Sequence, residues 1–406
     1  MATKRVLFVD DEPNILSGMK RMLRSLRNGL DMSFAESGKE ALELMKDEPF
    51  DIVVSDMRMP GMDGAELLTE IRKQYPETIR IMLTGQADSG SVMRTVTVAH
   101  QFLAKPCEPE RLKTTLHRAC LLHNLLSHPV MRKVVANIDT LPSLPEIYIR
   151  VQDLLADPDS SVDDVAKCIA RDIGMSAKIL QLVNSAFFGL FQHIESPAQA
   201  VHLLGLDTIK SLVLTVKIFS QYDEAQGVPS LRLEDLWEHS MMVGAYARKI
   251  TEQQTSNQKI IDDAFIAGLQ HDLGKLVLLA NMPEKYQEAL DLAARENIPV
   301  YQAESKIFQA THAEIGAYLL GLWGFPAAVI EAIVYHHKPL KYPGDSFDTV
   351  VAVHAANAFA HENKSGAGGG HGSLLDTEFL VRVNCEDRID SWREACRQDL
   401  GENDNV

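Results

Sequence analysis

The chain has 406 residues, which is longer than one typical domain and predicts two or three domains. Hydrophobic residues make up 46% of it and charged residues 24%, the balance of a globular protein with a sizeable core. The formal net charge of −16 argues against a nucleic-acid partner, and the lack of any run of 18 apolar residues argues against a membrane span.

The N-terminal part alternates β-rich apolar runs with amphipathic helical segments. The predicted strands are Arg5–Val9, Met32–Ala35, Asp51–Ser55, Ile79–Thr84 and Phe102–Ala104. The predicted helices are Pro13–Leu26, Gly38–Lys46, Gly64–Gln74, Asp88–Val98 and Pro109–Leu126. Five such units predict an α/β fold with a five-stranded, doubly wound parallel sheet, whose functional residues gather at the carboxyl ends of the strands.

Acidic, hydroxyl and basic side chains fall at these predicted strand ends. They are Asp10, Asp11, Asp56, Thr84 and Lys105. Clustered carboxylates repel one another and need a cation, and oxygen ligands suit Mg²⁺. A nearby lysine and hydroxyl suit a transferred phosphoryl group, which a carboxylate can accept as an acyl phosphate.

The N-terminal part resembles the receiver domain of bacterial response regulators. The resemblance is carried by VDD at 9–11, SDMRMPGMDG at 55–64, LTG at 83–85 and FLAKP at 102–106. It implies that a sensor histidine kinase phosphorylates Asp56 in the presence of Mg²⁺. It further implies roles for the other residues: Mg²⁺ held by Asp10, Asp11, Asp56 and the Met57 carbonyl, phosphate contacts from Thr84 and Lys105, and an aromatic switch at Phe102.

The last predicted receiver helix runs on toward Pro129. Apolar residues recur at helical spacing along it, at Leu116, Cys120, Leu121 and Leu125. This stripe predicts a connector helix with one buried face. A dimerising helix is the alternative, so a homodimer stays open.

Residues from about 137 to 360 have an almost wholly helical pattern, punctuated by prolines that suit helix starts and turns. A series of imidazoles and one carboxylate runs through this region: His239, His271, Asp272, His312, His336 and His337. Buried polar groups need partners, and imidazole with carboxylate suits a transition metal. Core hydrogen bonding without any metal is the alternative.

This second half resembles the HD phosphohydrolase superfamily and, more closely, its HD-related output domain, HDOD. The stretches that carry the resemblance are LPSLPEI, ILQLVNSAFFG, AVHLLGLDTIKSLVL, GLQHDLGKLVLL, THAEIGAYLLGLWGFP and IVYHHKP. The resemblance implies that His239, His271 and Asp272 are the first HD ligands and that Lys275 faces a phosphate. It implies that His312, His336 and His337 match the extra histidines of dinuclear relatives.

The resemblance departs from the superfamily at the last ligand. The expected aspartate aligns with Asn357 in VVAVHAANAFAH, with Asp345 or Asp348 as alternatives, and KPLKYPGDS lacks the full GYP signature. A neutral amide is a weaker ligand than a carboxylate. We therefore expect a degenerate site that binds divalent metal weakly in a mostly non-catalytic output domain.

These patterns together predict an organisation and a function. The expected parts are a receiver at 1–125, a helical connector at 126–140, an HDOD bundle at 141–360 and a glycine-rich loop with a C-terminal segment at 361–406. We expect a response regulator whose HDOD domain binds an unknown downstream signalling protein. The alternatives are a metal-dependent HD-type phosphodiesterase and a metal- or nucleotide-sensing module without turnover.

Several other classes lack their motifs. The chain has no GxxxxGK[ST] loop, no GxSxG elbow and no basic helix-turn-helix after the receiver. Its five cysteines are scattered without CxxC spacing, and its short apolar start is not a signal peptide. Reduced thiols and a cytoplasmic location are therefore expected.

Overall fold

The computed structural model describes most of the chain, and two predicted features fall largely outside it. The described residues are 3–26, 29–84, 98–126, 128–138, 141–143, 145–157, 159–183, 194, 196–210, 219–221, 233–365 and 375–402. The helix predicted at Asp88–Val98 and the glycine-rich loop at Ser365–Ser373 therefore lie almost wholly outside the described residues. No helix within these ranges is long and apolar enough to cross a membrane.

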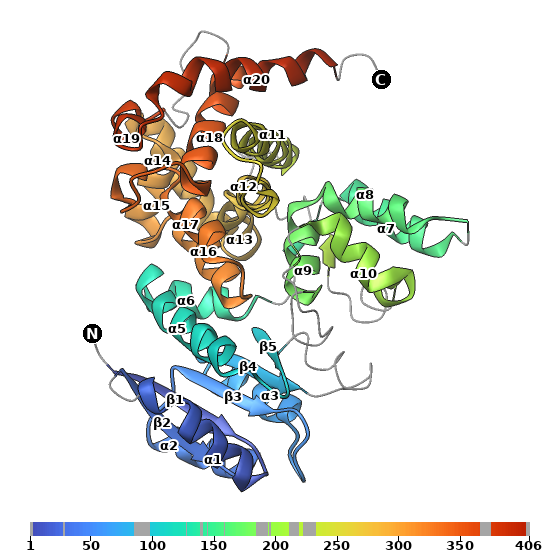
Figure 1. Ribbon diagram of the computed structural model, residues 1–406, viewed down its shortest axis with the longest axis vertical. Helices are drawn as coiled ribbons and strands as arrows, with labels where there is room; N and C mark the ends of the chain where they lie inside the picture. The colour runs from blue at the N-terminus through green and yellow to red at the C-terminus, as the bar shows by residue number, and fades with distance from the viewer. Residues whose placement is uncertain are drawn as a thin grey trace.

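The N-terminal residues form the predicted five-stranded parallel sheet (Figure 1). Its strands are β1 (Lys4–Val9), β2 (Leu30–Ala35), β3 (Ile52–Asp56), β4 (Ile79–Thr84) and β5 (Gln101–Ala104), in the spatial order β2-β1-β3-β4-β5. The order reverses between β1 and β3, and ligands of open α/β sheets bind in the crevice at such a point. Asp10 and Asp56 lie at the carboxyl ends of these two strands.

Helices cover both faces of the sheet. α1 (Pro13–Met22) and α5 (Pro109–Leu125) pack on one face, and α2 (Gly38–Asp47) and α3 (Gly64–Gln74) on the other. A 3-10 turn, η1 (Arg24–Leu26), follows α1. Alternate strand residues point to opposite faces, so Phe8 packs toward α1 and α5 whereas Leu7 packs toward α2 and α3.

The buried face of α5 departs from the predicted stripe at one position: Leu116 is buried, and Cys120 and Leu125 pack partly buried against the same core, but Leu121 does not. Leu122 is buried, whereas Leu121 is 45% exposed. The buried face follows Leu112, Leu116, Ala119 and Leu122, a spacing of four, three and three residues that keeps one side of a helix inward. α5 also ends at Leu125, and a separate helix, α6 (Pro129–Ala136), follows it. The connector is therefore two helices and not one continuous rod.

The second half is a helical domain with one small parallel sheet, which was not predicted. That sheet pairs β6 (Leu141–Ser143) with β7 (Phe219–Gln221). The helices are α7 (Pro145–Ala156), α8 (Val162–Ala170), α9 (Ile173–Val183), α10 (Pro197–Lys210), α11 (Leu233–Glu252), α12 (Gln258–Gln270), α13 (Leu273–Asn281), α14 (Pro283–Glu296), α15 (Val300–Phe308), α16 (His312–Leu322), α17 (Ala327–Tyr335), α18 (Thr349–Ser365), α19 (Thr377–Arg382) and α20 (Ile389–Glu402). Two 3-10 turns, η5 (Pro339–Lys341) and η6 (Glu386–Arg388), complete the fold.

The two halves are joined by a continuous apolar core. The sheet face under α1 and α5 belongs to the same cluster of buried residues as the interior of the helical domain. In Figure 1, α5 and α6 lie between the sheet and the end of α16. Gln101 of β5 donates from its side-chain amide to the Gly321 carbonyl of α16 over 3.2 Å, and Leu122 of α5 packs against the same glycine.

A buried arginine and histidine tie the sheet to the end of α6. Arg80 is 2% exposed, and its guanidinium donates to the Val98 carbonyl (2.7 Å) and the Ala136 carbonyl (2.9 Å). Nδ1 of His100 accepts the Arg80 backbone N–H over 3.0 Å, so its Nε2 carries the hydrogen and faces the Ala136 carbonyl at 3.0 Å. Burial first, and then the charge of Arg80, lower the pKa of His100 well below its usual range.

This histidine predicts a pH dependence of stability. The folded state keeps His100 neutral, while the unfolded chain takes up a proton below about pH 6.5, so stability is lost as the pH falls through that value. His100→Gln retains an N–H donor for Ala136 but does not titrate. Between pH 7.5 and 5.5, wild type should lose about 1.4 kcal/mol more unfolding free energy than the variant in urea titrations. Equal losses would show that His100 titrates normally.

Candidate functional site

The first candidate site lies at the carboxyl edge of the parallel sheet. Asp10 and Asp56 are both nearly fully buried, and Asp11 beside them is partly exposed. The Lys105 ammonium lies 2.6 Å from Asp10 Oδ2 and 2.5 Å from Asp56 Oδ1. The sheet therefore brings together the acids and the lysine that the sequence placed at strand ends.

Backbone contacts hold these groups in place. The Arg58 N–H donates to Asp56 Oδ2 over 3.0 Å, and the Gly64 N–H donates to the Met57 carbonyl over 3.0 Å. A Cβ on Gly64 would lie 2.1 Å from the Asp56 carbonyl oxygen, so only glycine allows α3 to begin this close to the end of β3. The Met57 carbonyl keeps a second lone pair that a cation can use.

The charges of this edge are partly balanced. Burial alone would lower the pKa of Lys105, but the hydrogen bonds that its ammonium donates to Asp10 and Asp56 outweigh burial and raise that pKa. The carboxylates of Asp10, Asp56 and the partly exposed Asp11 outnumber the single ammonium of Lys105, so the site keeps a net negative charge. Together with the Met57 carbonyl, these oxygens fit Mg²⁺, which prefers carboxylate ligands and retained waters.

Thr84 and Phe102 lie on neighbouring strands of the same edge. Thr84 is buried at the end of β4, and its carbonyl accepts the Lys105 N–H over 2.7 Å. Phe102 on β5 is buried on the α2 and α3 side of the sheet, whereas its neighbour Gln101 reaches the helical domain. A displacement of β5 would therefore act on both sides of the sheet.

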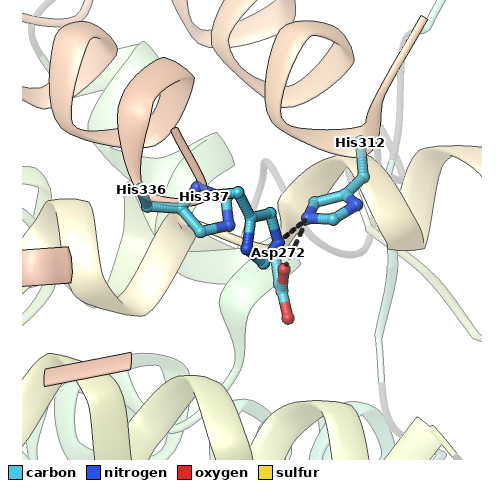
Figure 2. Close-up of side chains that lie close together, drawn as sticks. All are labelled: Asp272, His312, His336 and His337. Atoms are coloured by element: carbon cyan, nitrogen blue, oxygen red, sulfur yellow. Dashed lines mark hydrogen bonds and ion pairs between the residues drawn. The ribbon is translucent and has the colours of Figure 1, made fainter. Parts of the chain in front are cut away.

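The second candidate site is a cluster of imidazoles around one carboxylate in the helical domain. Five helices supply it: His239 lies on α11, His271 and Asp272 at the junction of α12 and α13, His312 at the start of α16, and His336 and His337 just after α17. Figure 2 shows His312, His336 and His337 converging on Asp272. Two sets of ligand atoms each lie within 4.8 Å of one another and share Asp272. One set is Asp272, His312, His336 and His337, and the other is His239, His271 and Asp272.

Asp272 is the centre of the cluster. It is 1% exposed, and its oxygens lie 2.6 Å from the Lys275 ammonium, 3.1 Å from Nε2 of His312 and 3.4 Å from Nε2 of His271. Burial raises the pKa of a carboxyl, but the neighbouring His271 side chain and the charge of Lys275 hold this pKa well below its usual value. Asp272 is therefore an anion that can bridge the two sets of nitrogens.

The imidazoles of His271 and His336 each have one nitrogen in a hydrogen bond and one nitrogen without a hydrogen-bond partner among the described residues. Nδ1 of His271 faces the Gly268 carbonyl at 2.7 Å, and Nδ1 of His336 faces the Ile333 carbonyl at 2.6 Å. A carbonyl only accepts, so each Nδ1 carries the hydrogen and each Nε2 has a lone pair. Within the described ranges, neither of these buried Nε2 atoms has a hydrogen-bond partner.

The side chains of His312 and His337 face each other through their Nε2 atoms. Nε2 of His337 lies 3.0 Å from Nε2 of His312, drawn as a dashed line in Figure 2. Buried lone pairs that point at a carboxylate and at other nitrogens are the arrangement of a metal site, in which outer hydrogen bonds set the tautomers. The cluster therefore fits a divalent transition metal.

Asn357 lies within the cluster, where the sequence alignment puts it. Its Oδ1 is 3.0 Å from Nε2 of His239. Of the alternatives, Asp348 accepts the Val350 N–H at the start of α18 and the Tyr342 hydroxyl, and Asp345 has no contact with the cluster among those described. An amide at this place adds an oxygen but no charge.

Two residues beside the cluster were not predicted from the sequence. Glu304 is fully buried and lies 2.6 Å from Nδ1 of His312, and the His361 ring lies 4.5 Å from that of His239. Glu304 follows Val300 by four residues and precedes Ile307 by three, so an acid on the apolar face of α15 was the available signal. His361 follows Asn357 by one helical turn, which puts both on one face of α18.

Close packing of α13 on α16 holds Asp272 beside His312. A Cβ on Gly274 would lie 1.9 Å from the His312 carbonyl oxygen. Gly274→Ala should therefore lower the unfolding free energy by about 2–3 kcal/mol, because the two helix backbones must separate. Gly18→Ala on α1 is the control, since nothing lies within 4 Å of its Cβ position, and it should raise stability by about 0.5–1 kcal/mol. Equal urea midpoints for the two variants would contradict the close approach.

Models of two protein families match the chain. The response regulator receiver domain matches residues 6–117, and the HDOD domain matches residues 141–339. These two ranges contain the sheet-edge site and most of the imidazole cluster, respectively; Asn357 and His361 lie beyond the second range.

Several known proteins are similar to parts of the chain. An uncharacterized protein of Treponema pallidum is 28% identical over 250 residues, which cover 60% of this chain and 47% of that protein. Response regulator protein PilR of Pseudomonas aeruginosa is 34% identical over 125 residues, which cover 30% of this chain and 28% of PilR. The chain thus spans less than half the length of these relatives. The MmoQ response regulator of Methylococcus capsulatus is 23% identical, with a TM-score of 0.49 over 61% of this chain and 94% of that one.

Proposed function

The chain carries a response regulator receiver domain followed by an HDOD domain, and we propose that phosphorylation of Asp56 in the first domain controls the second. A receiver domain implies interaction with a sensor kinase, and we propose a histidine kinase as the phosphoryl donor. The controlled output is the binding of a downstream signalling protein by the HDOD domain.

The residues of the sheet edge support this chemistry. Asp56 presents a carboxylate oxygen beside Lys105, and Mg²⁺ bound by Asp10, Asp11, Asp56 and the Met57 carbonyl would neutralise charge on an incoming phosphoryl group. The Lys105 ammonium pairs with Asp56 already, so it needs only a small displacement to pair with a phosphate there. Thr84 supplies a hydroxyl on the next strand.

One observation carries the control of the HDOD domain: a single helix, α16, contacts the receiver at one end and the imidazole cluster at the other. Gly321 near its C-terminus contacts Gln101 and Leu122 of the receiver. His312, its first residue, lies against Asp272. His312 and Gly321 are nine positions apart, about 14 Å along the helix, so a short rigid element joins the two sites.

The direct contact between the receiver and α16 replaces the helical connector as the proposed route of coupling between the two domains. α5 and α6 are separate helices, so motion along one continuous rod does not explain the coupling. Gln101 and Phe102 are neighbours on β5 and point to opposite faces, so a change around Phe102 reaches α16 through one strand. Coupling of about 1–3 kcal/mol is enough to shift an output several-fold.

The test perturbs the receiver end of α16. A Cβ on Gly321 would lie 2.1 Å from Leu122 Cδ2, so Gly321→Ala should displace the contact and reduce the coupling by about 1 kcal/mol or more. The measurement is hydrogen exchange of α13 and α16 with and without a phosphodonor and Mg²⁺. Phosphorylation should change exchange there in wild type, and the variant should show about a fifth of that effect or less.

Two further variants make the result specific. Adding Leu122→Ala to Gly321→Ala makes room for the new methyl group and should restore part of the response. Leu121→Ala, on the exposed side of the same helix, should leave the response unchanged. A full wild-type response in the Gly321→Ala protein would rule out α16 as the route.

A second candidate function is a metal-dependent phosphohydrolase regulated by the receiver. The free Nε2 atoms of His271 and His336 around Asp272 favour metal binding, which we propose for this cluster. A bound metal would supply an activated water, and Lys275 would lie where it can pair with a phosphate. Asn357 in place of an acid argues against efficient turnover. Hydrolysis of a cyclic dinucleotide by wild type that disappears in His271→Ala would favour the phosphohydrolase over the binding module.

A further inference from the structure

Glu304 on α15 is a fully buried carboxylate outside the set of expected metal ligands. Burying an isolated carboxylate is costly, so it needs a partner that compensates its charge. Its partner is His312, on the next helix. The pair joins α15 to the start of α16, where the imidazole cluster begins.

The geometry places a hydrogen on Nδ1 of His312. Glu304 Oε2 lies 2.8 Å from the His312 backbone nitrogen and 2.6 Å from its Nδ1. An ionised carboxylate only accepts hydrogen bonds, so Nδ1 carries a hydrogen and donates it to Glu304. Nε2 then points away from Glu304, toward Asp272 Oδ1 at 3.1 Å and Nε2 of His337 at 3.0 Å.

His312 differs in this respect from the other oriented imidazoles. His271 and His336 donate from Nδ1 to backbone carbonyls of their own helices. His312 donates to a charged carboxylate supplied by a different helix. A carboxylate partner makes the opposite nitrogen a more basic ligand and fixes the plane of the ring.

We propose that Glu304 is a positioning residue that holds His312 as a metal ligand, with Nδ1 protonated and Nε2 directed into the cluster. The inference rests on the metal binding proposed above for this cluster. Glu304 itself belongs to neither set of ligand atoms, and its Oε2 is engaged by the backbone nitrogen and Nδ1 of His312. Glu304 raises the affinity of the cluster for metal by orienting the His312 ring and making its Nε2 more basic.

The test is a titration of the metal-free full-length protein with Co²⁺, followed by visible absorption, with Zn²⁺ in competition. Glu304→Gln keeps the size and an acceptor oxygen but removes the charge. It should weaken Co²⁺ binding about 10–100-fold, and Glu304→Ala should weaken it further and alter the absorption bands. Glu331→Gln, an exposed glutamate on α17, is the matched control and should bind as wild type does.

The outcomes separate this inference from the proposal on which it rests. If wild type binds neither Co²⁺ nor Zn²⁺, the proposal that the cluster binds metal is wrong. Wild type that binds Co²⁺ while Glu304→Gln binds within about twofold would leave the metal site standing and overturn the role of Glu304. If the variants do not fold, ¹⁵N shifts of His312 in Zn²⁺-loaded wild type decide: Nδ1 protonated supports the role, and Nδ1 bound to metal overturns it.

Discussion

Asp56→Asn is expected to abolish acyl-phosphate formation from acetyl phosphate and Mg²⁺. An amide oxygen is not the nucleophile that a carboxylate is, and Asp56 is the acid that lies against Lys105 at the end of β3. The variant should remain folded. Its loss of an ion pair to a partly exposed lysine is offset by relief of repulsion from Asp10, so stability should change by less than about 1 kcal/mol.

The measurement is the fraction of protein that carries a phosphoryl group after isolation in acid. Mass spectrometry of the intact chain determines this fraction. Asp47→Asn, at the exposed end of α2, is the control and should be phosphorylated as wild type is. The hydrogen-exchange response of α16 should disappear together with the adduct. Undiminished phosphorylation of Asp56→Asn would assign the phosphoryl group to another residue, which peptide mapping would identify.

Asp272→Asn is expected to have the largest effect in the helical domain. Both sets of ligand atoms share this carboxylate, so the variant should bind Co²⁺ or Zn²⁺ at least about 100-fold more weakly than wild type. It should also destabilise the metal-free protein by about 3 kcal/mol, because the Lys275 ammonium loses the anion that compensates its charge.

A buried aspartate elsewhere in the same domain supplies the control. Asp263 on α12 is also nearly fully buried and pairs with Lys259 at 2.9 Å, but it is not in the cluster. Asp263→Asn should leave the metal affinity unchanged. Metal bound equally tightly by Asp272→Asn and wild type would show that Asp272 is not a ligand, and absence of binding by both would favour a network of core hydrogen bonds.

Local patterns sufficed for the sheet and for its functional edge. Short apolar runs separated by helical segments predict parallel strands, and the carboxyl ends of parallel strands share one edge. The convergence of Asp10, Asp56 and Lys105 follows from that rule, because each residue lies at the carboxyl end of a strand. The phase of α5 was harder: Leu121 and Leu122 are adjacent and both apolar, and only packing against Gly321 decides which one is buried.

By itself, the sequence determined the two domains, the strand-end acids, and the imidazoles and carboxylate of the helical half, because each is written in local spacing or motif. Only the packing of the whole chain brings α16 against both the receiver and the cluster and puts Glu304 beside Nδ1 of His312. Gln101 and Gly321 are 220 residues apart in the chain, and their contact depends on how two separately built cores pack together. Helical spacing specifies which residues share a face, but not which distant surface that face meets.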